Sequence, residues 1–516
     1  MSKFRFFKSP VSINNTLRNL KTKPASFWEK LGEKMVLNLL HFTHNAVPAY
    51  KKLLKEKKIN INKIKKIEDF KKLPIIDKNS YCKKYSFGDL FPNRDLSQIT
   101  TFSATSGSTG EPFYFPRGEE QDWQYEYVAE LFLKNQWQID KKKTLGVIGF
   151  GLGIWIGGIF TYKVFNILAQ KGYKISLIPT GPNKELFLKS LKKFGHMFNQ
   201  VILMGYPPFV KDIIDEARDY GINWKDYNIR ILTAAEGFSE EFRNYIARKT
   251  LLNNPINDVI NIYGTVELGT MAHETAFTNL IRKIACQKPK VFQKIFPEAN
   301  RMPTLAQYHP YIVYFEEVDG EVVVSGIGSS IPLLRYKLAD RGGVIPFDEM
   351  IRKFKKGGIN LFKEAKKAKI DKTILKLPFV YVYERSDLAT TLFGILIYPE
   401  YIKSAFQNKS LSNYLTGKFT MTTKTDRQQN QFLEINVELK KGERRNDRLI
   451  KTIKDCVVKS LMRRSTEYNY LYKNSTPAYQ RKLFPKIVLW PHEHSLYFAP
   501  GTKQKWVKKN NYSTIE

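Results

Sequence analysis

Between residues 144 and 270, short apolar runs alternate with segments whose apolar residues recur at helical spacing. Apolar runs of roughly four to eight residues are typical of buried β-strands. Strands that alternate with helices form a parallel sheet with helices packed on its faces, which restricts the fold class to α/β. The expected strands are 174–181, 200–207, 229–236 and 258–264, and the expected helices are 183–194, 209–221 and 239–251.

The chain continues well beyond this region. Its 516 residues exceed what one hydrophobic core usually holds, so at least two domains are expected. Residues 309–326 predict a β-hairpin that turns at Asp319-Gly320. A basic tract of helical character follows at 351–376, and strand and helix patterns resume beyond about residue 385. We therefore expect a large α/β N-terminal domain, residues 1–385, and a small α+β C-terminal domain, residues 386–516.

The charge is strongly positive, with 84 Lys and Arg residues against 49 Asp and Glu residues and a formal net charge of +35. Nearly all of the excess lies in the tracts 1–72, 351–376 and 440–516. These tracts are rich in Lys, whereas specific recognition of bases favours the planar guanidinium of Arg. We expect no specific nucleic-acid partner. A solvated surface is the simplest explanation, and loose contact with a membrane surface or another polyanion stays open.

The uncharged stretch 144–162 is just long enough to span a bilayer as a helix. Six glycines lie within it and lower its helix propensity, so we interpret it as a buried strand that enters a Gly-rich turn. We expect no transmembrane segment. Three widely separated cysteines and the lack of a secretion signal favour a cytoplasmic location. The histidines show no zinc-ligand spacing with Cys or carboxylates.

The sharpest local signal is the segment Thr105–Pro112, with the sequence TSGSTGEP. Small residues allow backbone N–H groups to converge on an oxyanion, and the hydroxyls donate further hydrogen bonds. The segment is not a Walker loop, because no Gly-Lys-Ser/Thr follows. A plain Ser/Gly turn is the alternative. Taken alone, the segment therefore indicates a phosphate loop without proving one.

With this loop, the sequence resembles the adenylate-forming ligase superfamily. It is most similar to the branch of phenylacetate–CoA ligases and capsular polysaccharide biosynthesis proteins. The other segments that resemble this branch follow one another in the family's order, from the N-terminal helix to the hinge motif. They are 46–54, 72–81, 150–160, 234–241, 262–269, 331–342 and 384–394.

The resemblance implies a fold and an activity. The large domain would be the adenylate-forming, AMP-binding domain, and the small domain would be a mobile lid. The enzyme would use ATP and Mg²⁺ to activate a carboxylic acid as an acyl-adenylate. It would then pass the acyl group to CoA, or to another thiol or amine acceptor. Members of this branch often form homodimers. Trp155, Tyr206 and Phe209 suggest an apolar or aromatic acid.

The resemblance also assigns residues to the nucleotide. Asp340 would accept hydrogen bonds from the ribose, Tyr263 would stack on the adenine, and Glu236 would lie beside it. A strand-end carboxylate is the other interpretation of Glu236. The full set of nucleotide residues is Thr105, Ser106, Gly107, Ser108, Thr109, Gly110, Glu236, Tyr263, Gly264, Thr265, Asp340 and Arg385.

Further roles follow from the same resemblance. Glu267 would hold Mg²⁺ through a hard oxygen ligand, and Lys78 would reach the triphosphate. Lys503, with Lys505 as the alternative, would bridge the acid carboxylate and the phosphate as a compact positive charge. Asp387 would be the hinge on which the C-terminal domain turns.

The sequence departs from the family pattern at several positions. Val266 stands where a hydroxyl usually contacts the α-phosphate, and Thr265 directly precedes it. Residues 275–305 are an apparent insertion after the Glu267 motif. These departures leave a second hypothesis open. In it, the protein is a catalytically relaxed or non-CoA member that acts in cell-surface polysaccharide biosynthesis, or docks a carrier through its basic tracts.

Overall fold

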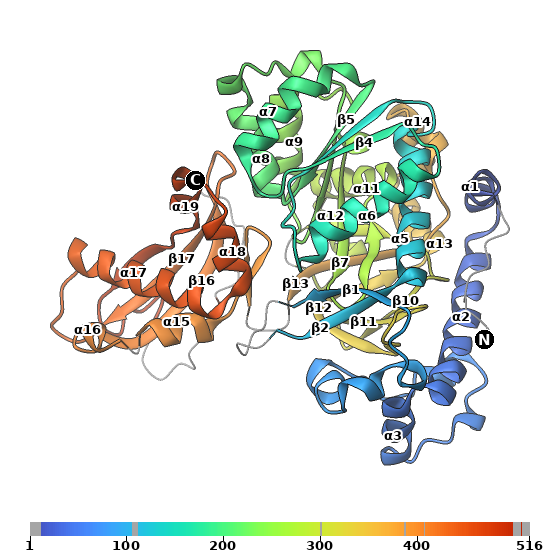
Figure 1. Ribbon diagram of the computed structural model, residues 1–516, viewed down its shortest axis with the longest axis horizontal. Helices are drawn as coiled ribbons and strands as arrows, with labels where there is room; N and C mark the ends of the chain where they lie inside the picture. Colours follow the sequence, from blue (N-terminus) through green and yellow to red (C-terminus); the bar gives the residue numbers. More distant parts are fainter. Residues whose placement is uncertain are drawn as a thin grey trace.

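The structure is a computed structural model, and it describes residues 12–105, 112–299, 302–385, 389–406, 408–498 and 507. Figure 1 shows two bodies side by side, which we call the large unit, residues 12–385, and the small unit, residues 389–498. One cluster of buried apolar side chains lies wholly within 392–489. The other three clusters contain only residues up to 383. Each unit therefore has a hydrophobic core of its own.

The large unit is built on one mixed sheet. Its strands are β3 (Thr144–Ile148), β4 (Ile175–Pro179), β5 (Gln200–Gly205), β6 (Ile229–Ala234), β7 (Val259–Thr265), β8 (Gly269–His273), β9 (Thr304–Gln307), β10 (Val313–Val318), β11 (Glu321–Gly326), β12 (Tyr336–Ile345) and β13 (Phe379–Arg385). Their order is β10-β11-β12-β13-β9-β8-β7-β6-β5-β3-β4. Strands β3 to β7 pair in parallel, and the pairs from β7–β8 onward are antiparallel. Beside this sheet, β1 (Ile99–Ala104) and β2 (Tyr114–Gly118) form an antiparallel pair.

Helices surround the sheet. Those of the large unit are α1 (Ile13–Thr22), α2 (Ala25–Ala46), α3 (Pro48–Glu56), α4 (Ile67–Phe70), α5 (Glu119–Phe132), α6 (Ile156–Gln170), α7 (Lys184–Phe194), α8 (Pro207–Glu216), α9 (Glu240–Thr250), α10 (Pro255–Asp258), α11 (Ala276–Gln287), α12 (Pro289–Ile295), α13 (Phe347–Lys356) and α14 (Leu361–Lys367). The N-terminal helices cover the antiparallel half of the sheet, where Trp28 of α2 lies 5.6 Å from the ring of Tyr311.

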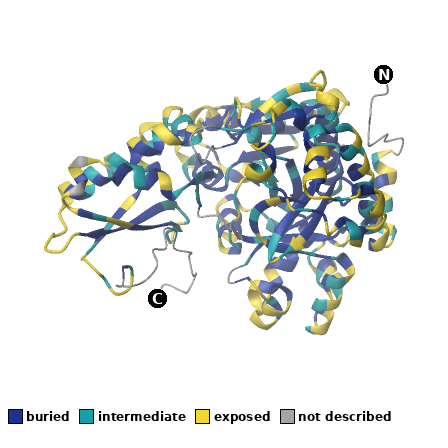
Figure 2. Ribbon diagram, turned by 90° about the horizontal axis from the view of Figure 1, so that it is seen from below, coloured by how far each residue is buried: buried dark blue, intermediate teal, exposed yellow. Residues whose placement is uncertain are grey.

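The parallel strands are buried on both faces. Successive side chains of a strand point to opposite sides of the sheet, and helices cover both sides. Val147 and Leu203 pack on one face with α7, α8 and α9. Ile148 and Ile202 pack on the other face, in the core that includes α5 and α6. Figure 2 shows this arrangement as dark buried strands inside helices whose outer surfaces are exposed.

The small unit has an α+β arrangement. Its elements are β14 (Thr390–Leu392), β15 (Ile395–Ile397), α15 (Pro399–Phe406), α16 (Lys409–Ser412), β16 (Leu415–Thr425), β17 (Gln431–Leu439), α17 (Asp447–Arg464), α18 (Thr466–Lys473), α19 (Pro477–Leu483) and β18 (Lys486–Trp490). Strands β16 and β17 are antiparallel, β18 joins β17 in parallel, and β14 and β15 form a separate hairpin. Figure 1 shows α18 and α19 on the side of this unit that faces the large unit.

The α/β fold class and the seven predicted elements are confirmed, with shifts at their ends. The hairpin is also confirmed: it joins β10 and β11 and turns at Asp319 and Gly320, whose φ angles are 53° and 73°. The uncharged stretch 144–162 divides into β3 and the start of α6, and no helix among the described residues is long and apolar enough to cross a membrane. Within 275–305, the described residues form α11, α12 and the start of β9, so this segment adds helices to the core.

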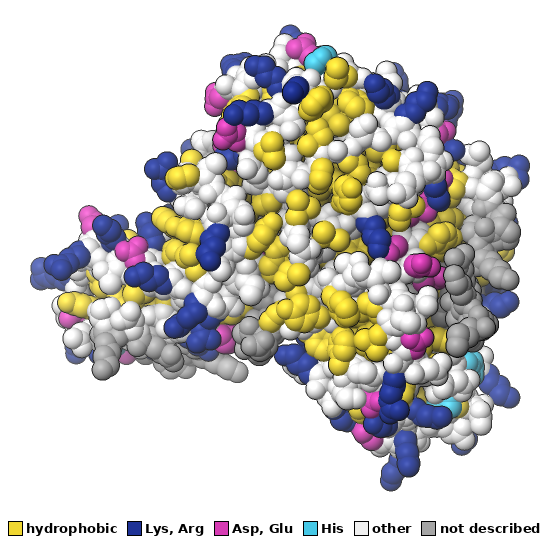
Figure 3. Space-filling model, in the orientation of Figure 1, with side chains coloured by type: hydrophobic (Ala, Val, Ile, Leu, Met, Phe, Trp, Pro, Cys, Tyr) yellow, Lys and Arg dark blue, Asp and Glu magenta, His cyan; other side chains and the backbone are white. Residues whose placement is uncertain are grey.

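The positive charge is dispersed on the surface. On the face seen in Figure 3, Lys and Arg side chains are spread over both units instead of gathering in one patch. Several are paired locally, as in the contact of 2.5 Å between Lys84 and Glu56. This distribution supports the interpretation of a solvated, Lys-rich surface.

Two buried histidines lie in the antiparallel half of the large unit, His273 at the end of β8 and His309 between β9 and β10. His273 and His309 are fully or almost fully buried, and their ring centroids are 6.2 Å apart. Nδ1 of His273 lies 2.9 Å from the carbonyl oxygen of Glu274, and Nδ1 of His309 lies 2.9 Å from the hydroxyl of Tyr311. Burial lowers the pKa of His273 to about 4, against the effect of the Glu274 carbonyl. Burial, together with His273, lowers the pKa of His309 to about 3.

Replacing His273 and His309 with glutamine is expected to make the free energy of unfolding depend less on pH between pH 7 and pH 4. In the unfolded chain a histidine takes up a proton near pH 6.5, whereas the buried rings stay neutral to about pH 4. The unfolded state therefore binds more protons between these values, and the free energy of unfolding falls as the pH is lowered. Each histidine contributes up to about 1.4 kcal/mol per pH unit. Urea unfolding between pH 7 and pH 4 measures the slope.

The exposed His41 provides the control. The His41→Gln variant should keep the wild-type slope, and the His273→Gln/His309→Gln variant should lose part of it. Equal slopes in all three proteins would contradict the assignment of neutral buried histidines.

Candidate active site

The motif Tyr263–Glu267 lies in a tight hairpin at the centre of the sheet. Tyr263, Gly264 and Thr265 end β7, the turn follows, and Thr265 pairs with Gly269 at the start of β8. A Cβ atom on Gly264 would lie 2.5 Å from the carbonyl oxygen of Gly269, so only glycine fits this position. Thr265 Oγ1 accepts a long hydrogen bond of 3.4 Å from the amide of Leu268.

Two side chains that the sequence did not indicate hold the turn between β7 and β8 in place. The guanidinium of Arg117 is 1% exposed and donates to the carbonyl oxygens of Val266 and Glu267. The hydroxyl of Tyr125 donates to the carbonyl oxygen of Leu268. Buried backbone acceptors require such partners. The side chain of Val266 packs against the main core, which explains an apolar residue at this position.

The carboxylate of Glu267 lies beside Lys78. Their Oε1 and Nζ atoms are 3.3 Å apart, and the hydroxyl of Tyr336 donates to Oε1 at 3.4 Å. Lys78 begins a helical turn, Lys78–Cys82, whose start is fixed by hydrogen bonds between Asp77 and Ser80 in both directions. Thus the structure brings together two predicted site residues that are far apart in the sequence.

A second pair of predicted residues meets on the other side of the hairpin. The hydroxyl of Tyr263 donates to Oδ2 of Asp340 at 2.7 Å, and the Tyr263 ring lies near-parallel to Phe315 with centroids 6.3 Å apart. Asp340 is 5% exposed and stands in β12, where its backbone pairs with Arg385 of β13. A phenol ring and a carboxylate in this arrangement suit an aromatic base and the hydroxyls of its sugar.

Thr105 closes the neck of the predicted phosphate loop. Its amide donates to the carbonyl oxygen of Phe113 at 3.0 Å, and its hydroxyl accepts from the amide of Phe113 at 3.1 Å. Both ends of the loop are thereby held together. The predicted site residues that lie outside the described residues are Ser106, Gly107, Ser108, Thr109, Gly110, Asp387, Lys503 and Lys505.

Glu236 lies at the seam between the two units. Its Oε2 accepts a hydrogen bond of 2.9 Å from Gln431 of β17, and its carbonyl oxygen accepts from Asn261 at 3.0 Å. Burial raises the pKa of the Glu236 carboxyl to about 7, while Gln431 and the amide of Gly394 favour the charged form. The strand-end carboxylate is thus a contact point for the small unit.

Three further contacts cross the seam. Nζ of Lys211 in α8 donates to Asn430 at 2.8 Å, and Lys482 of α19 pairs with the adjacent Asp212 at 2.5 Å. The rings of Trp155 and Tyr470 lie 6.2 Å apart. The small unit is therefore held against the α8 side of the large unit, next to the carboxyl ends of the parallel strands.

The aromatic residues suggested for an acid site divide into two groups. Tyr206 and Trp155 lie at the seam, and Tyr206 stands edge-on to Phe150 with centroids 5.2 Å apart. Phe209, in contrast, is 1% exposed and packs on Phe187 between α7, α8 and the sheet. The suggestion for Phe209 was wrong, because it faces the core from the first turn of α8.

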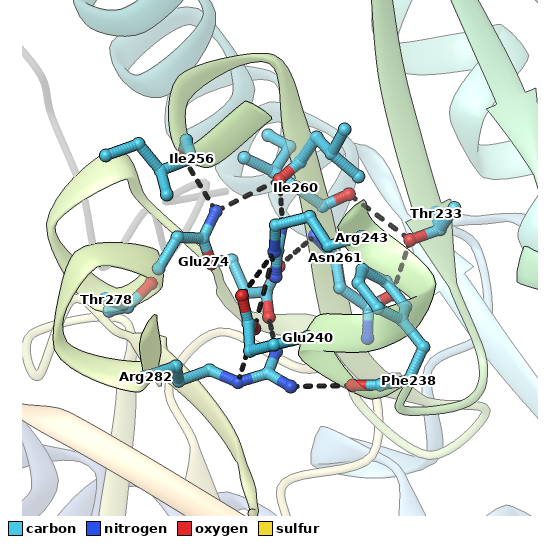
Figure 4. A network of polar contacts seen from close by, with 12 residues as sticks. Thr233, Phe238, Glu240, Arg243, Ile256, Ile260, Asn261, Glu274, Thr278 and Arg282 are labelled. Carbon is cyan, nitrogen blue, oxygen red and sulfur yellow. Dashed lines mark hydrogen bonds and ion pairs between the residues drawn. The ribbon is translucent and has the colours of Figure 1, made fainter. Parts of the chain in front are cut away.

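A buried network of charged side chains lies next to β7, the strand that carries Tyr263 (Figure 4). Arg243 and Arg282 both contact the carboxylate of Glu274, the former at 2.9 Å, and both lie 3.2 Å from Glu240. Arg282 also donates to the carbonyl oxygen of Phe238 at 2.6 Å. The amide of Asn261 donates to Glu274 at 3.0 Å. The network therefore joins α9 and α11 to β7 and to the loop that follows Glu236.

No magnesium site of several protein ligands is present in the described part of the chain, where no group of three His, Cys, Asp or Glu side chains could hold a metal. Glu267 nevertheless fits Mg²⁺ bound in the usual way for nucleotide enzymes, through one or two carboxylates together with substrate phosphates.

No protein-family profile matches the chain, and no curated protein sequence matches it. Among solved structures, 2-hydroxyisobutyryl-CoA ligase in complex with 2-HIB-AMP and CoA in the thioesterification state is similar, with a TM-score of 0.63 at 14% identity over 95% of this chain and 91% of that chain. The same enzyme in an open conformation with 2-HIB-AMP and CoA gives 0.54 at 13% identity over 96% and 94%. In the postadenylation state with 2-HIB-AMP it gives 0.53 at 14% identity over 96% and 92%. The chain therefore has the adenylate-forming ligase fold that the sequence predicted.

Replacing Arg282 by methionine is expected to lower the free energy of unfolding by about 3–5 kcal/mol. The change removes one partner from a buried charge network and leaves Glu240 and Glu274 undercompensated. Lys283→Met is the matched control, because Lys283 is the next residue of α11 and is exposed. Its effect should stay within about 0.5 kcal/mol. Urea unfolding at pH 7 compares the two variants, and equal midpoints would contradict a stabilising role of the network.

Proposed function

We propose that the protein uses ATP to activate a carboxylic acid as an acyl-adenylate and then transfers the acyl group to a thiol or amine acceptor, CoA being the first candidate. The observation that carries the proposal is the convergence of Lys78, Glu267, Tyr263 and Asp340 on one hairpin. The adenylate-forming ligase fold supports it.

In the proposed reaction, the nucleotide binds with its adenine against Tyr263 and its ribose hydroxyls on Asp340. The loop after Thr105 receives the β- and γ-phosphates through backbone amides and hydroxyls. Lys78 neutralises negative charge close to the α-phosphate, where the acid carboxylate attacks and pyrophosphate leaves. Glu267 is the residue that would hold Mg²⁺, and the ion would supply further positive charge to the phosphates. Holding two anions in line is the main requirement of this step.

The arrangement of the two units supports a role in the transfer step. The TM-score is 0.63 against the thioesterification state of 2-hydroxyisobutyryl-CoA ligase and 0.53–0.54 against its other two states. We propose that the small unit turns about Asp387, at a boundary between residues 385 and 386. In the other orientation it would present Lys503, or Lys505, to the acid and the phosphate.

We further propose that the acid is apolar or aromatic, and that the chain belongs to the phenylacetate–CoA ligase branch. The rings of Phe150 and Tyr206 contact each other beside the seam, and the ring of Trp155 contacts Tyr470 of the small unit. The ordered motifs of the sequence support the branch.

Acid-dependent release of pyrophosphate tests the proposal. The full-length protein is incubated with ATP, Mg²⁺ and a panel of aliphatic and aromatic carboxylic acids, and pyrophosphate is measured against a reaction without acid. We expect release with at least one apolar or aromatic acid. No release with any acid, together with no shift of the melting temperature on addition of ATP, would contradict the proposed function.

Lys503→Ala is expected to reduce pyrophosphate release at least a hundredfold while leaving the ATP-induced rise in melting temperature in place. The reason is that a single ammonium placed at the forming acyl–phosphate bond stabilises the transition state and adds little to nucleotide binding. Lys505→Ala is the matched comparison. If only Lys505→Ala lost activity, the role would move to that residue, and full activity of both variants would contradict a catalytic lysine in this tail.

A further inference from the structure

One cation of the small unit forms ion pairs with the large unit. Nζ of Lys482, in α19, lies 2.5 Å from Oδ1 of Asp212 in α8 and 4.0 Å from Oε1 of Glu216 on the same helix. Among the described residues, no other Lys or Arg pairs with a carboxylate across the seam. We call Asp212 and Lys482 the seam pair.

The carboxylate of Asp212 depends on the small unit for its partner. Asp212 is 4% exposed, and within the part of the chain that the structure describes its one hydrogen-bond and ion-pair partner is Lys482. Its other oxygen, Oδ2, is buried there without a hydrogen-bond partner. The neighbouring Lys211 differs, because its ammonium donates to Asp215 of its own helix at 2.6 Å as well as to Asn430. If the small unit moved away, Lys211 would keep a partner and Asp212 would have water alone.

The packing around the seam pair is incomplete. A cavity of about 290 Å³ lies there between the units, and both units contribute to its wall, among other residues through Pro208, Asp212, Phe393 and Lys482. The clusters of buried apolar side chains in the described chain also stop at the seam, since one lies within 392–489 and the other three contain only residues up to 383. Individual contacts, instead of a shared hydrophobic core, therefore hold the units together.

Burial makes this arrangement sensitive to the loss of Lys482. It raises the pKa of the Asp212 carboxyl, and the positive charge of Lys482 is the main influence that opposes the rise. Removing one partner of a buried ion pair leaves an uncompensated charge, whereas replacing both partners by apolar residues of similar volume is often neutral. Water can compensate Asp212 once the units separate. Loss of Lys482 alone should therefore disfavour the observed orientation and leave each unit folded.

We propose that the seam pair selects the orientation of the small unit seen in this structure, and that it thereby favours the transfer step over activation. This inference rests on the proposed function, in which this orientation serves transfer and another one serves activation. Asp212 and Lys482 are positioning residues in this role, because they hold the small unit in place and take no part in the chemistry. The pair would form each time the small unit turns toward α8.

The first test compares the two half-reactions in the full-length protein. Acid-dependent ATP–pyrophosphate exchange reports activation, and formation of acyl-CoA on addition of CoA reports transfer. We expect Lys482→Met to lower transfer at least about tenfold, because Asp212 stays buried without its counter-charge, while exchange stays at the wild-type level or above. The double variant Asp212→Leu/Lys482→Met should recover transfer to within about threefold of wild type, since it leaves no unpaired charge at the seam. Lys459→Met, at an exposed position of α17, is the control and should change neither step.

The second test measures the orientation itself and needs no substrate. Spin labels are attached to the exposed Cys286 of α11 and to Glu443→Cys, in the exposed loop before α17, in a Cys456→Ser background. The remaining cysteine, Cys82, is buried. Pulsed electron paramagnetic resonance then gives the distribution of distances between the units. We expect one dominant distance for the wild-type sequence and for the double variant, and a second or broader distribution for Lys482→Met.

The outcomes separate this inference from the proposed function. Equal distance distributions with and without Lys482→Met, or a double variant that recovers neither distance nor transfer, would overturn the inference alone. Equal loss of exchange and transfer in Lys482→Met would also overturn it, because a positioning role affects the second step selectively. Absence of exchange with every acid in the wild-type protein would overturn the proposed function, and with it the link between this orientation and transfer.

Discussion

The arrangement of the site depends on how the turn between β7 and β8 is fixed. Arg117 and Tyr125 bind the three carbonyl oxygens of the turn from one side. From the other side, Glu274 binds the amide of Asn261 in β7 and is itself held by two buried arginines. These polar contacts lie in the interior, where an unsatisfied group would cost several kcal/mol, so the turn has little freedom to shift. The fixed turn therefore determines where Tyr263 and Glu267 lie.

Functional side chains from distant parts of the chain meet at this rigid turn. Lys78 reaches Glu267 from the N-terminal helical region, and Asp340 reaches Tyr263 from the antiparallel half of the sheet. The carboxyl ends of the parallel strands then leave room for a second body. In the structure that space is taken by the small unit, which is attached through Gln431 and Lys482. A rigid candidate site beside a separately folded unit would be well suited to the two successive reactions proposed here.

Much of this could be predicted from the sequence. Short apolar runs predicted the strands between 174 and 264, and apolar residues at helical spacing predicted the helices. Gly264 belonged to a motif whose spacing is set by the turn. Arg117 and Tyr125 could not be found in this way. Their hydrogen-bond partners lie far away in the chain, and a single Arg in a strand or Tyr in a helix carries no local pattern. Phe209 failed for the related reason that burial direction depends on packing, and the helical character of 275–305 was hidden by its lack of family motifs.

Whether the hairpin at Tyr263–Glu267 binds ATP decides the function proposed for the protein. A crystal structure of the full-length protein with ATP and Mg²⁺ is the sharpest test. We expect the adenine against the ring of Tyr263, the ribose hydroxyls on the carboxylate of Asp340, and the triphosphate between the loop after Thr105 and Lys78. A nucleotide bound elsewhere, with Tyr263 and Asp340 still joined to each other and remote from it, would show that the hairpin is not the ATP site.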